Sequence, residues 1–311
     1  MIAISDLTKR FGAITAVDGV SMKVARGEVL GFLGPNGAGK STTMRMVTGY
    51  LPPTAGTIEV CGHDVAADPI AARRHIGYLP EGAPLYGDMS TIDYLTFIAQ
   101  ARGFTREAAS PLIQRAVATV ELEGVLHQPI DTLSKGFKRR VGLAQAMLHD
   151  PEVLILDEPT DGLDPNQKRQ VRSLIRDMSP DKAIVISTHI LEEVEAVCTR
   201  AVIIAAGRVV FDGSPAELRR RSTHHNAVTI RLGAELATEA KSQIEQMAEV
   251  ARVEVAEPEH GTTTLVAVPH DGRPIVHEVS ERVRSAGLAV NELFAERGEL
   301  DEVFYRLTVG H

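Results

Sequence analysis

Residues 28–47 read EVLGFLGPNGAGKSTTMRMV, and this stretch decides the fold. An apolar run ends at Leu33, a glycine-rich loop follows, and the residues after the loop are compatible with a helix. The loop, Gly34–Ser41, fits the pattern G-x-x-x-x-G-K-[S/T] in the strand, loop and helix order that this pattern requires. A chance glycine-rich turn before a helix is the alternative. The complete context favours a loop that binds phosphate groups.

The residue types in this loop suit phosphate chemistry. Glycines allow backbone N–H groups to converge on phosphate oxygens, and the helix N-terminus adds a favourable dipole. Lys40 adds a positive charge, and the hydroxyl of Ser41 can ligate Mg²⁺. The pattern therefore indicates a nucleoside triphosphate with its metal ion.

A second motif lies downstream, where the apolar run Val153–Asp157 ends in two carboxylates. We expect Asp157 to support the Mg²⁺ shell and Glu158 to orient or deprotonate the attacking water. An acidic pair after a strand is, taken alone, more often a solvated turn. Together with the phosphate loop, the pair indicates hydrolysis.

The composition is that of a globular protein, with 44% hydrophobic and 24% charged residues. A chain of 311 residues is longer than a usual single domain, so we expect one large and one small domain. The net charge of −8 argues against a broad nucleic-acid-binding surface, and we expect no nucleic acid partner. We interpret the basic run Lys138–Arg140 as a solvated helix face.

Cysteine use and hydropathy bear on location. Cys61 and Cys198 lie far apart and form neither a metal pair nor a redox motif, which fits a reducing, cytoplasmic setting. No apolar stretch approaches the ~20 residues that a membrane-spanning helix needs. The first ten residues, MIAISDLTKR, are typical of a strand rather than a secretory signal. Contact with a membrane would therefore require a partner.

The pattern along the chain predicts an α/β domain over residues 1–220 with a largely parallel sheet. Residues 91–148 have apolar positions at helical spacing and predict a helical subdomain inserted at about 88–150. The polar stretch Ser222–Asn226 marks a boundary, and residues 226–311 predict a small α+β domain of order βαββαβ, which matches a ferredoxin-like topology. Strands are expected at 28–33, 153–157, 183–187, 228–232, 253–255, 264–268 and from 288, and C-terminal helices at 236–247 and 276–283.

The stretch 133–164, LSKGFKRRVGLAQAMLHDPEVLILDEPTDGLD, carries a family resemblance. It resembles the ABC ATPases, whose signature is LSGGQ, and the likeness covers residues 1 to about 220. The resemblance implies a P-loop NTPase fold of the ABC ATPase type and Mg²⁺-dependent hydrolysis of ATP to ADP and phosphate.

The resemblance also assigns site residues. Phe11 matches the aromatic residue that stacks on adenine, although a Phe after a strand is equally often a core residue. Asp157 and Glu158 match the metal-supporting and catalytic acids, and His189 matches the histidine that contacts the γ-phosphate. Ser134 and Gly136 match signature positions that contact the γ-phosphate held by the opposite subunit. The segment 160–164 matches the loop that links two active sites across a dimer. The implied phosphate-loop residues are Gly34, Pro35, Asn36, Gly37, Ala38, Gly39, Lys40, Ser41 and Thr42.

Three positions depart from the family pattern. Glu81 stands where the family usually has a glutamine, and its carboxylate can still ligate Mg²⁺ but adds negative charge near the γ-phosphate. Lys135 and Phe137 replace a glycine and a glutamine of the signature. These departures resemble the exporter branch that includes gliding-motility and multidrug or antibiotic export ATPases.

The resemblance implies two partners. One is a second copy of the chain, with ATP sandwiched head to tail between the two subunits. The other is an integral membrane permease, which would place the chain peripherally on the cytoplasmic side of the inner membrane. Closure of the dimer would drive the permease, with motion passing through the segment from Glu81 to about Ile92.

Other functions remain open. The chain could be a soluble ABC ATPase that moves no solute, but it has neither the second cassette typical of translation factors nor the coiled-coil insertion typical of repair proteins. It could also serve an importer, with a regulatory C-terminal domain. That domain could be a sensor, a dimer brace or a stabilising cap. We interpret His224 and His225 as part of a solvated linker rather than a metal site.

Overall fold

The structure is a computed structural model that describes residues 1–82 and 85–309, and its contacts divide it into two compact units. The first unit spans residues 1–215 and the second 216–309. Within residues 1–82 and 85–309, every helix is too short or too polar to span a lipid bilayer. The division lies a few residues before the boundary expected at 220–226.

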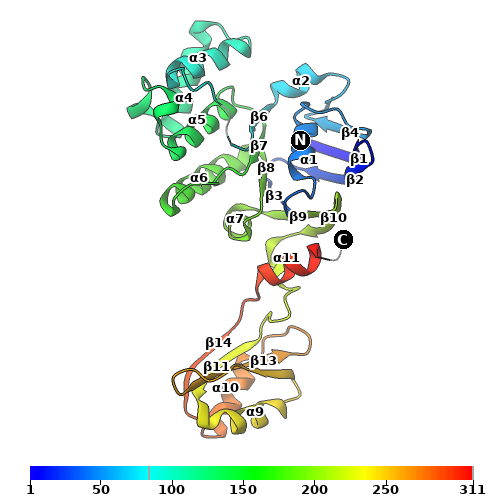
Figure 1. The fold of residues 1–311 in the computed structure, drawn as a ribbon, viewed down its shortest axis with the longest axis vertical. Coiled ribbons are helices and arrows are strands. Elements are labelled where there is room, and N and C mark those ends of the chain that lie inside the picture. The colour runs from blue at the N-terminus through cyan, green and yellow to red at the C-terminus, as the bar shows by residue number, and fades with distance from the viewer. Residues whose placement is uncertain (83–84, 310–311) are drawn as a thin grey trace. The chain divides into compact units, whose positions relative to one another are not determined.

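A six-stranded sheet of order β10-β9-β3-β8-β7-β6 forms the centre of the first unit (Figure 1). All strand pairs are parallel except β9 with β10 at one edge. The predicted strand at 153–157 is present in full, because a strand covered on both faces is a continuous apolar run in the sequence. The strands are β3 (Val29–Leu33), β6 (Ile76–Leu79), β7 (Val153–Asp157), β8 (Ala183–Thr188), β9 (Arg200–Ala205) and β10 (Arg208–Gly213).

The two faces of this sheet have different covers. Successive side chains of a strand point to opposite faces, so Leu154 and Leu156 join one hydrophobic cluster while Val153 and Ile155 join another. The first cluster contains residues of α3 (Thr91–Ala101), α4 (Arg106–Thr119), α5 (Lys135–Met147) and α6 (Pro165–Met178). The second contains residues of α1 (Lys40–Val47), α2 (Pro69–Arg74) and a second sheet.

This second sheet is antiparallel, with order β2-β1-β4-β5, and sequence analysis missed all of it except the strand at the N-terminus. The alternation in that strand is interrupted at Asp6, whose φ of 49° shifts the register, so that Leu7 follows Ile4 into the core. The missed strands give weaker signals: Gly19, with φ of 66°, interrupts Ile14–Val24, and Ala55–Val60 and His63–Asp64 are short. The strands are β1 (Ile2–Phe11), β2 (Ile14–Val24), β4 (Ala55–Val60) and β5 (His63–Asp64).

Helices α3, α4 and α5 follow one another between β6 and β7, and no strand is assigned within the segment 91–148. Each begins at a hydroxyl residue that caps it: Ser90, Thr105 and Ser134 accept hydrogen bonds from backbone N–H groups of the first turn. The remaining elements of this unit are α7 (Leu191–Val197) and short 3₁₀ turns at Glu123–Val125, Ile130–Thr132 and Ser179–Asp181, and α8 (Pro215–Arg219) lies at the division.

The second unit has the order β-α-β-β-α-β, followed by one more helix. Its sheet, of order β12-β13-β11-β14, has antiparallel neighbours throughout, and its core packs two helices against the sheet. The 3₁₀ turn Ala234–Leu236 precedes α9, which ends at Glu245, before the buried Met247 that the sequence had placed in it. The elements are β11 (Val228–Gly233), α9 (Ala237–Glu245), β12 (Val250–Val255), β13 (Thr262–Pro269), α10 (Val276–Ser285), β14 (Val290–Ala295) and α11 (Leu300–Thr308).

The polar stretch 222–226 is part of the second unit rather than a free linker. Ser222 Oγ donates to Glu302 Oε2 of α11 at 2.7 Å, and the backbone N–H of Thr223 donates to the same oxygen at 3.2 Å. His224 lies 3.0 Å from a carboxylate oxygen of Glu254. Among the described residues no cluster of three or more His, Cys, Asp or Glu could hold a metal ion. These contacts explain why the division falls before residue 222.

Candidate functional site

The predicted phosphate loop connects β3 to α1, and its glycines are required by close backbone contacts. A Cβ at Gly34 would lie 2.4 Å from Ile204 O, and a Cβ at Gly39, whose φ is 108°, would lie 2.4 Å from Ala16 O. By contrast, a Cβ at Gly37 would meet nothing within 4 Å. The inner side of the loop is therefore packed on backbone while its outer side is open, as a cradle for an anion must be. Pro35 and Asn36 are exposed and Ala38 is buried.

Lys40 is the first residue of α1 and is only 7% exposed. Its ammonium donates to Gly34 O at 2.7 Å and to Pro35 O at 3.2 Å. Burial lowers the pKa of Lys40, and the negative charges of three carboxylates, Glu158, Asp157 and Glu81, oppose that shift. Ser41 and Thr42 follow in the first turn and are half-buried. The three predicted acids therefore lie close enough to the Lys40 ammonium to act on its charge.

Asp157, the last residue of β7, is 2% exposed. Burial raises the pKa of its carboxyl group, while the nearby Ser187 and Ser41 hydroxyls and the Lys40 ammonium lower it. Asp157 Oδ1 and Ser187 Oγ are buried without a hydrogen-bonding partner among the described residues. Buried oxygen atoms without partners, next to a serine hydroxyl, are the kind of ligand that Mg²⁺ prefers. The donor set thus fits a magnesium ion.

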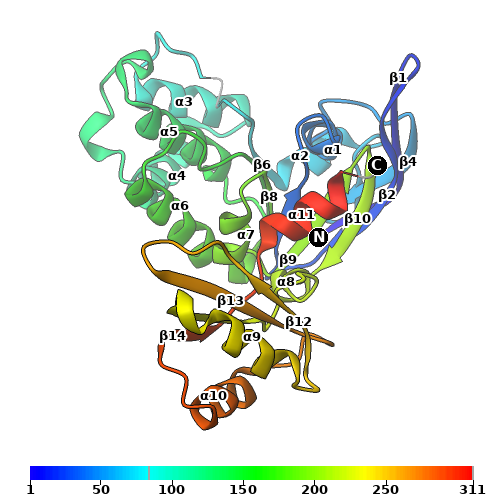
Figure 2. The ribbon, with the colours of Figure 1, turned by 60° about the horizontal axis from the view of Figure 1, so that its bottom comes forward.

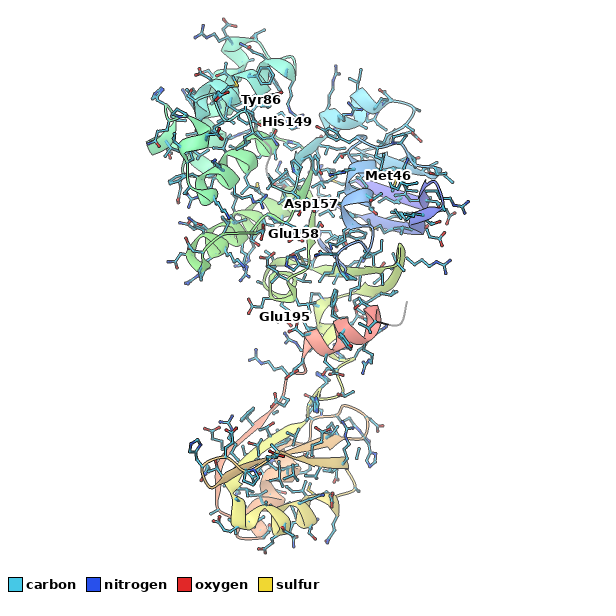
Figure 3. The ribbon with its side chains drawn as sticks, in the orientation of Figure 1. Met46, Tyr86, His149, Asp157, Glu158 and Glu195 are labelled. Atoms are coloured by element: carbon cyan, nitrogen blue, oxygen red, sulfur yellow. The ribbon has the colours of Figure 1, made fainter. Side chains whose placement is uncertain are left out.

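Glu158 follows Asp157 and has a left-handed backbone, with φ of 49°. This conformation costs a non-glycine residue about 1 kcal/mol, and such strain is concentrated at functional sites. Its side chain is 12% exposed, and Oε1 lies 3.0 Å from Nδ1 of His189, while Oε2 is buried without a hydrogen-bonding partner among the described residues. Figure 3 shows Asp157 and Glu158 side by side at the end of β7. His189 thus orients Oε1 of Glu158, and Oε2 is available to accept a hydrogen bond.

Two further predicted residues lie in exposed positions. Glu81 is exposed in the turn after β6, close enough for its charge to raise the pKa of both Lys40 and Asp157. Part of the segment predicted to transmit motion, residues 83–84, lies outside the described residues. Phe11, at the end of β1, is 48% exposed, with Lys9 Nζ 5.2 Å from its ring centroid. Phe11 is therefore not a core residue.

Ser134 and Gly136 lie at the start of α5, away from the phosphate loop. Ser134 Oγ accepts a hydrogen bond from the Phe137 N–H at 3.3 Å, and a Cβ at Gly136 would lie 2.4 Å from Gln167 Nε2 of α6. Their helix α5 packs on the face of the six-stranded sheet opposite to that of the phosphate-loop helix α1. Figures 1 and 2 show α5 and α1 on different sides of β6, β7 and β8. The structure does not bring the signature residues to the phosphate loop of the same chain.

The basic run 138–140 contains a buried arginine, Arg139, which the sequence analysis did not predict. It is not a solvated helix face, because Arg139 is 5% exposed, and Nη1 has no hydrogen-bonding partner among the described residues. Arg140 pairs with Glu121 at 2.9 Å. Arg139 shares the inner helix face of Leu143, four residues on, so helical periodicity could have identified it. Burial lowers the pKa of Arg139, and the charges of Asp161, Glu158, Asp157 and Glu81 oppose this shift.

Comparison with known proteins places the chain in a family. A family model described as ABC transporter matches residues 17–161. The ABC transporter ATP-binding protein YxlF of Bacillus subtilis is 33% identical over 307 residues, which cover 99% of each chain. The chain belongs to the ABC transporter ATP-binding family. The predicted family and its ATPase activity are thereby confirmed.

Two further ABC proteins extend the comparison. The Nod factor export ATP-binding protein I of Ralstonia nicotianae is 29% identical over 309 residues, covering 99% of this chain and 94% of its own. A solved structure of an ATP-binding subunit of an ABC transporter has a TM-score of 0.66 and 32% identity, over 71% of this chain and 92% of its own. This ABC ATPase is therefore a transporter subunit with the P-loop ABC fold.

Proposed function

We propose that this ABC ATPase powers an exporter, and that two copies close head to tail around two ATP molecules to drive a separate membrane permease. The observation that carries the proposal is the separation of the two half-sites. Lys40, Asp157 and Glu158 lie together, whereas the helix that begins at Ser134 packs on the opposite sheet face. A chain folded in this way completes a site only with a second copy. The export name of the Ralstonia relative supports the direction.

Each residue has a proposed task in hydrolysis. The backbone N–H groups of Gly34 and of residues 36–42, together with the ammonium of Lys40, bind the β- and γ-phosphates. Ser41, Asp157 and Glu81 hold the magnesium ion, which when bound neutralises charge on the phosphates.

Two side chains act on the water and the γ-phosphate. Glu158 Oε2, which has no other partner among the described residues, accepts a proton from the attacking water. His189 fixes the other oxygen of Glu158 and contacts the γ-phosphate.

The remaining residues bind the rest of the nucleotide and the partner subunit. Phe11 offers an exposed ring on which adenine can stack. Ser134 and Gly136, at the start of α5, meet the γ-phosphate held by the other copy, where a helix N-terminus favours an anion. Lys135 is exposed, and its Cδ lies near Gly162 of the same chain, 3.6 Å from the position that a Cβ would occupy there.

We place the permease contact at a cavity of about 910 Å³ in the first unit. Four aromatic residues line it, and so do three arginines, while none of the described lining residues is a carboxylate. An acidic, amphipathic cytoplasmic segment of a permease complements this lining in shape and charge. The aromatic residues are Tyr50, Tyr78, Tyr94 and Phe104, and the arginines are Arg73, Arg74 and Arg102.

The cavity also adjoins the catalytic acids. Tyr78 and Pro80 line it and lie just before Glu81. Burial, and next the charge of Asp157, raises the pKa of Tyr78 to about 12. A permease segment in the cavity would therefore press on the strand that leads to Glu81, which gives motion a short route between the two sites.

We also propose a division of the chain by role. The three helices between β6 and β7 form a helical subdomain that carries the signature, and their shared cluster with α6 supports this. The second unit is a ferredoxin-like accessory domain, supported by its βαββαβ order and its sheet order β12-β13-β11-β14.

Arg74→Glu tests the permease contact. The side chain is exposed on the cavity wall, so reversing its charge should reduce co-purification with the permease about 10-fold or more, without changing ATP hydrolysis by the chain alone. The measurement is pull-down from detergent extracts after co-expression with a six-span membrane protein encoded beside the chain. Lys23→Glu, an equal charge change on an exposed residue of β2, is the control. If the wild type, Arg74→Glu and Lys23→Glu recover equal amounts of permease, the permease binds somewhere other than this cavity.

A further inference from the structure

Glu193, on α7, is a buried carboxylate that joins the loop after β7 to the end of β8. It is 3% exposed, although it lies on a short helix at the edge of the catalytic region. The hydroxyl of Thr160 donates to Oε1, and the hydroxyl of Thr188 donates to Oε2 at 3.1 Å. Lys168 Nζ of α6 lies 4.0 Å from Oε1. Both oxygens of one carboxylate are therefore used to hold other parts of the chain.

Each of the two threonines lies close to one member of the proposed catalytic pair in the sequence. Thr160 lies two residues after Glu158, and Thr188 directly precedes His189. Thr188 Oγ1 also accepts the Ile190 N–H at 3.1 Å, so its side chain fixes the backbone on both sides of His189. The Glu158 and His189 side chains meet at 3.0 Å. Glu193 is thus hydrogen-bonded, through Thr160 and Thr188, to the two segments whose Glu158 and His189 side chains contact each other.

The environment of Glu193 makes this connection costly to build. Burial raises the pKa of its carboxyl group, and the hydrogen bond from Thr188 and the charges of Lys168 and Arg172 lower it again. A buried carboxylate is tolerated only where hydrogen bonds and charges compensate its desolvation. The same short helix also buries the apolar side chains of Leu191 and Val194, which need no such compensation. Packing alone does not explain a glutamate here.

We propose that Glu193 is a positioning residue for ATP hydrolysis, which holds the Glu158 and His189 loops in register through Thr160 and Thr188. The inference rests on the proposed roles of Glu158 and His189. Glu193 itself touches neither nucleotide nor water in this scheme. Its removal should let the two loops move apart and so slow the chemical step, while the phosphate loop continues to bind ATP.

Glu193→Ala in the full chain is the main test. We expect kcat for ATP hydrolysis to fall about 10-fold to 100-fold while KM stays within about 3-fold, because the loss falls on the transition state rather than on binding. Glu193→Gln should recover kcat to within about 3-fold of the wild type, since an amide can still bridge two hydroxyls. Glu192→Ala, which removes an exposed carboxylate from the same helix, is the matched control and should behave as wild type.

If Glu193→Ala does not fold, the positioning role is tested with two other variants, Thr160→Val and Thr188→Val. Each removes one hydroxyl with little change in volume, and each should lower kcat by about 3-fold or more at unchanged KM. Either valine change should have little further effect in a Glu193→Ala background, because residues acting through one network are not additive.

Three results would overturn the inference: a folded Glu193→Ala protein with kcat within about 2-fold of wild type, a glutamine variant as slow as the alanine variant, or two threonine variants with normal kcat. The inference would fail by itself if Glu158→Gln were inactive while Glu193→Ala hydrolysed ATP normally. The proposed catalytic roles would fail instead if Glu158→Gln kept normal turnover.

Discussion

Glu158→Gln should slow ATP turnover about 100-fold to 1,000-fold and leave ATP affinity within a few-fold of the wild type. The amide keeps the size of the side chain but cannot accept the proton of the attacking water. The side chain is only 12% exposed and its Oε2 is free of other partners among the described residues, so few neighbouring groups could replace it. Phosphate release under saturating ATP measures the effect.

The same variant should accumulate as an ATP-bound dimer on size-exclusion chromatography, because closure would occur without hydrolysis to reopen the pair. Glu192→Gln makes the same chemical change at an exposed position and should remain active and monomeric under identical conditions. If Glu158→Gln hydrolyses ATP at the wild-type rate, Glu158 is not the base.

Lys40→Ala should weaken ATP binding at least about 10-fold to 100-fold, because a charge-assisted hydrogen bond to phosphate contributes about 1.5–3 kcal/mol. Turnover should be lost with it. The ammonium now bonds to the carbonyls of Gly34 and Pro35, so the variant also leaves two loop acceptors without a donor. Equilibrium binding of a fluorescent ATP analogue measures the affinity directly.

A thermal melt separates loss of binding from loss of fold in this variant. A Lys40→Ala protein that melts like the wild type without nucleotide, but gains no stability when ATP is added, supports the assigned site. A protein that still gains stability with ATP and still hydrolyses it would show that the phosphate loop has been assigned to the wrong residues.

The sequence predicted best where one physical cause dominates. Val153–Asp157 is buried on both faces, so its apolar run identifies the strand from end to end. The phosphate loop is equally clear, since the contacts of Gly34 and Gly39 with backbone leave no room for a side chain. Of the N-terminal antiparallel sheet only β1 was predicted: Gly19, with φ of 66°, interrupts the alternation in β2, and β4 and β5 are short.

Long-range geometry was beyond the sequence pattern. The left-handed backbone of Glu158 has no signal in its residue type, and the burial of Arg139 within a basic run follows only once the inner face of α5 is known. Glu193 was not predicted as a site residue, although it lies four residues before Val197 and so shares a helix face with an apolar side chain. The roles of the individual site residues remain predictions for the experiments above.

The placement of α1 and α5 on opposite faces of one sheet has a quantitative consequence. In the proposed dimer, free chains must collide before either can turn over ATP, so the specific activity of a purified sample should rise with its concentration. A permease that holds two copies at neighbouring sites replaces collision by a high effective molarity. Futile ATP consumption by stray subunits is then suppressed by dilution alone, without any inhibitor.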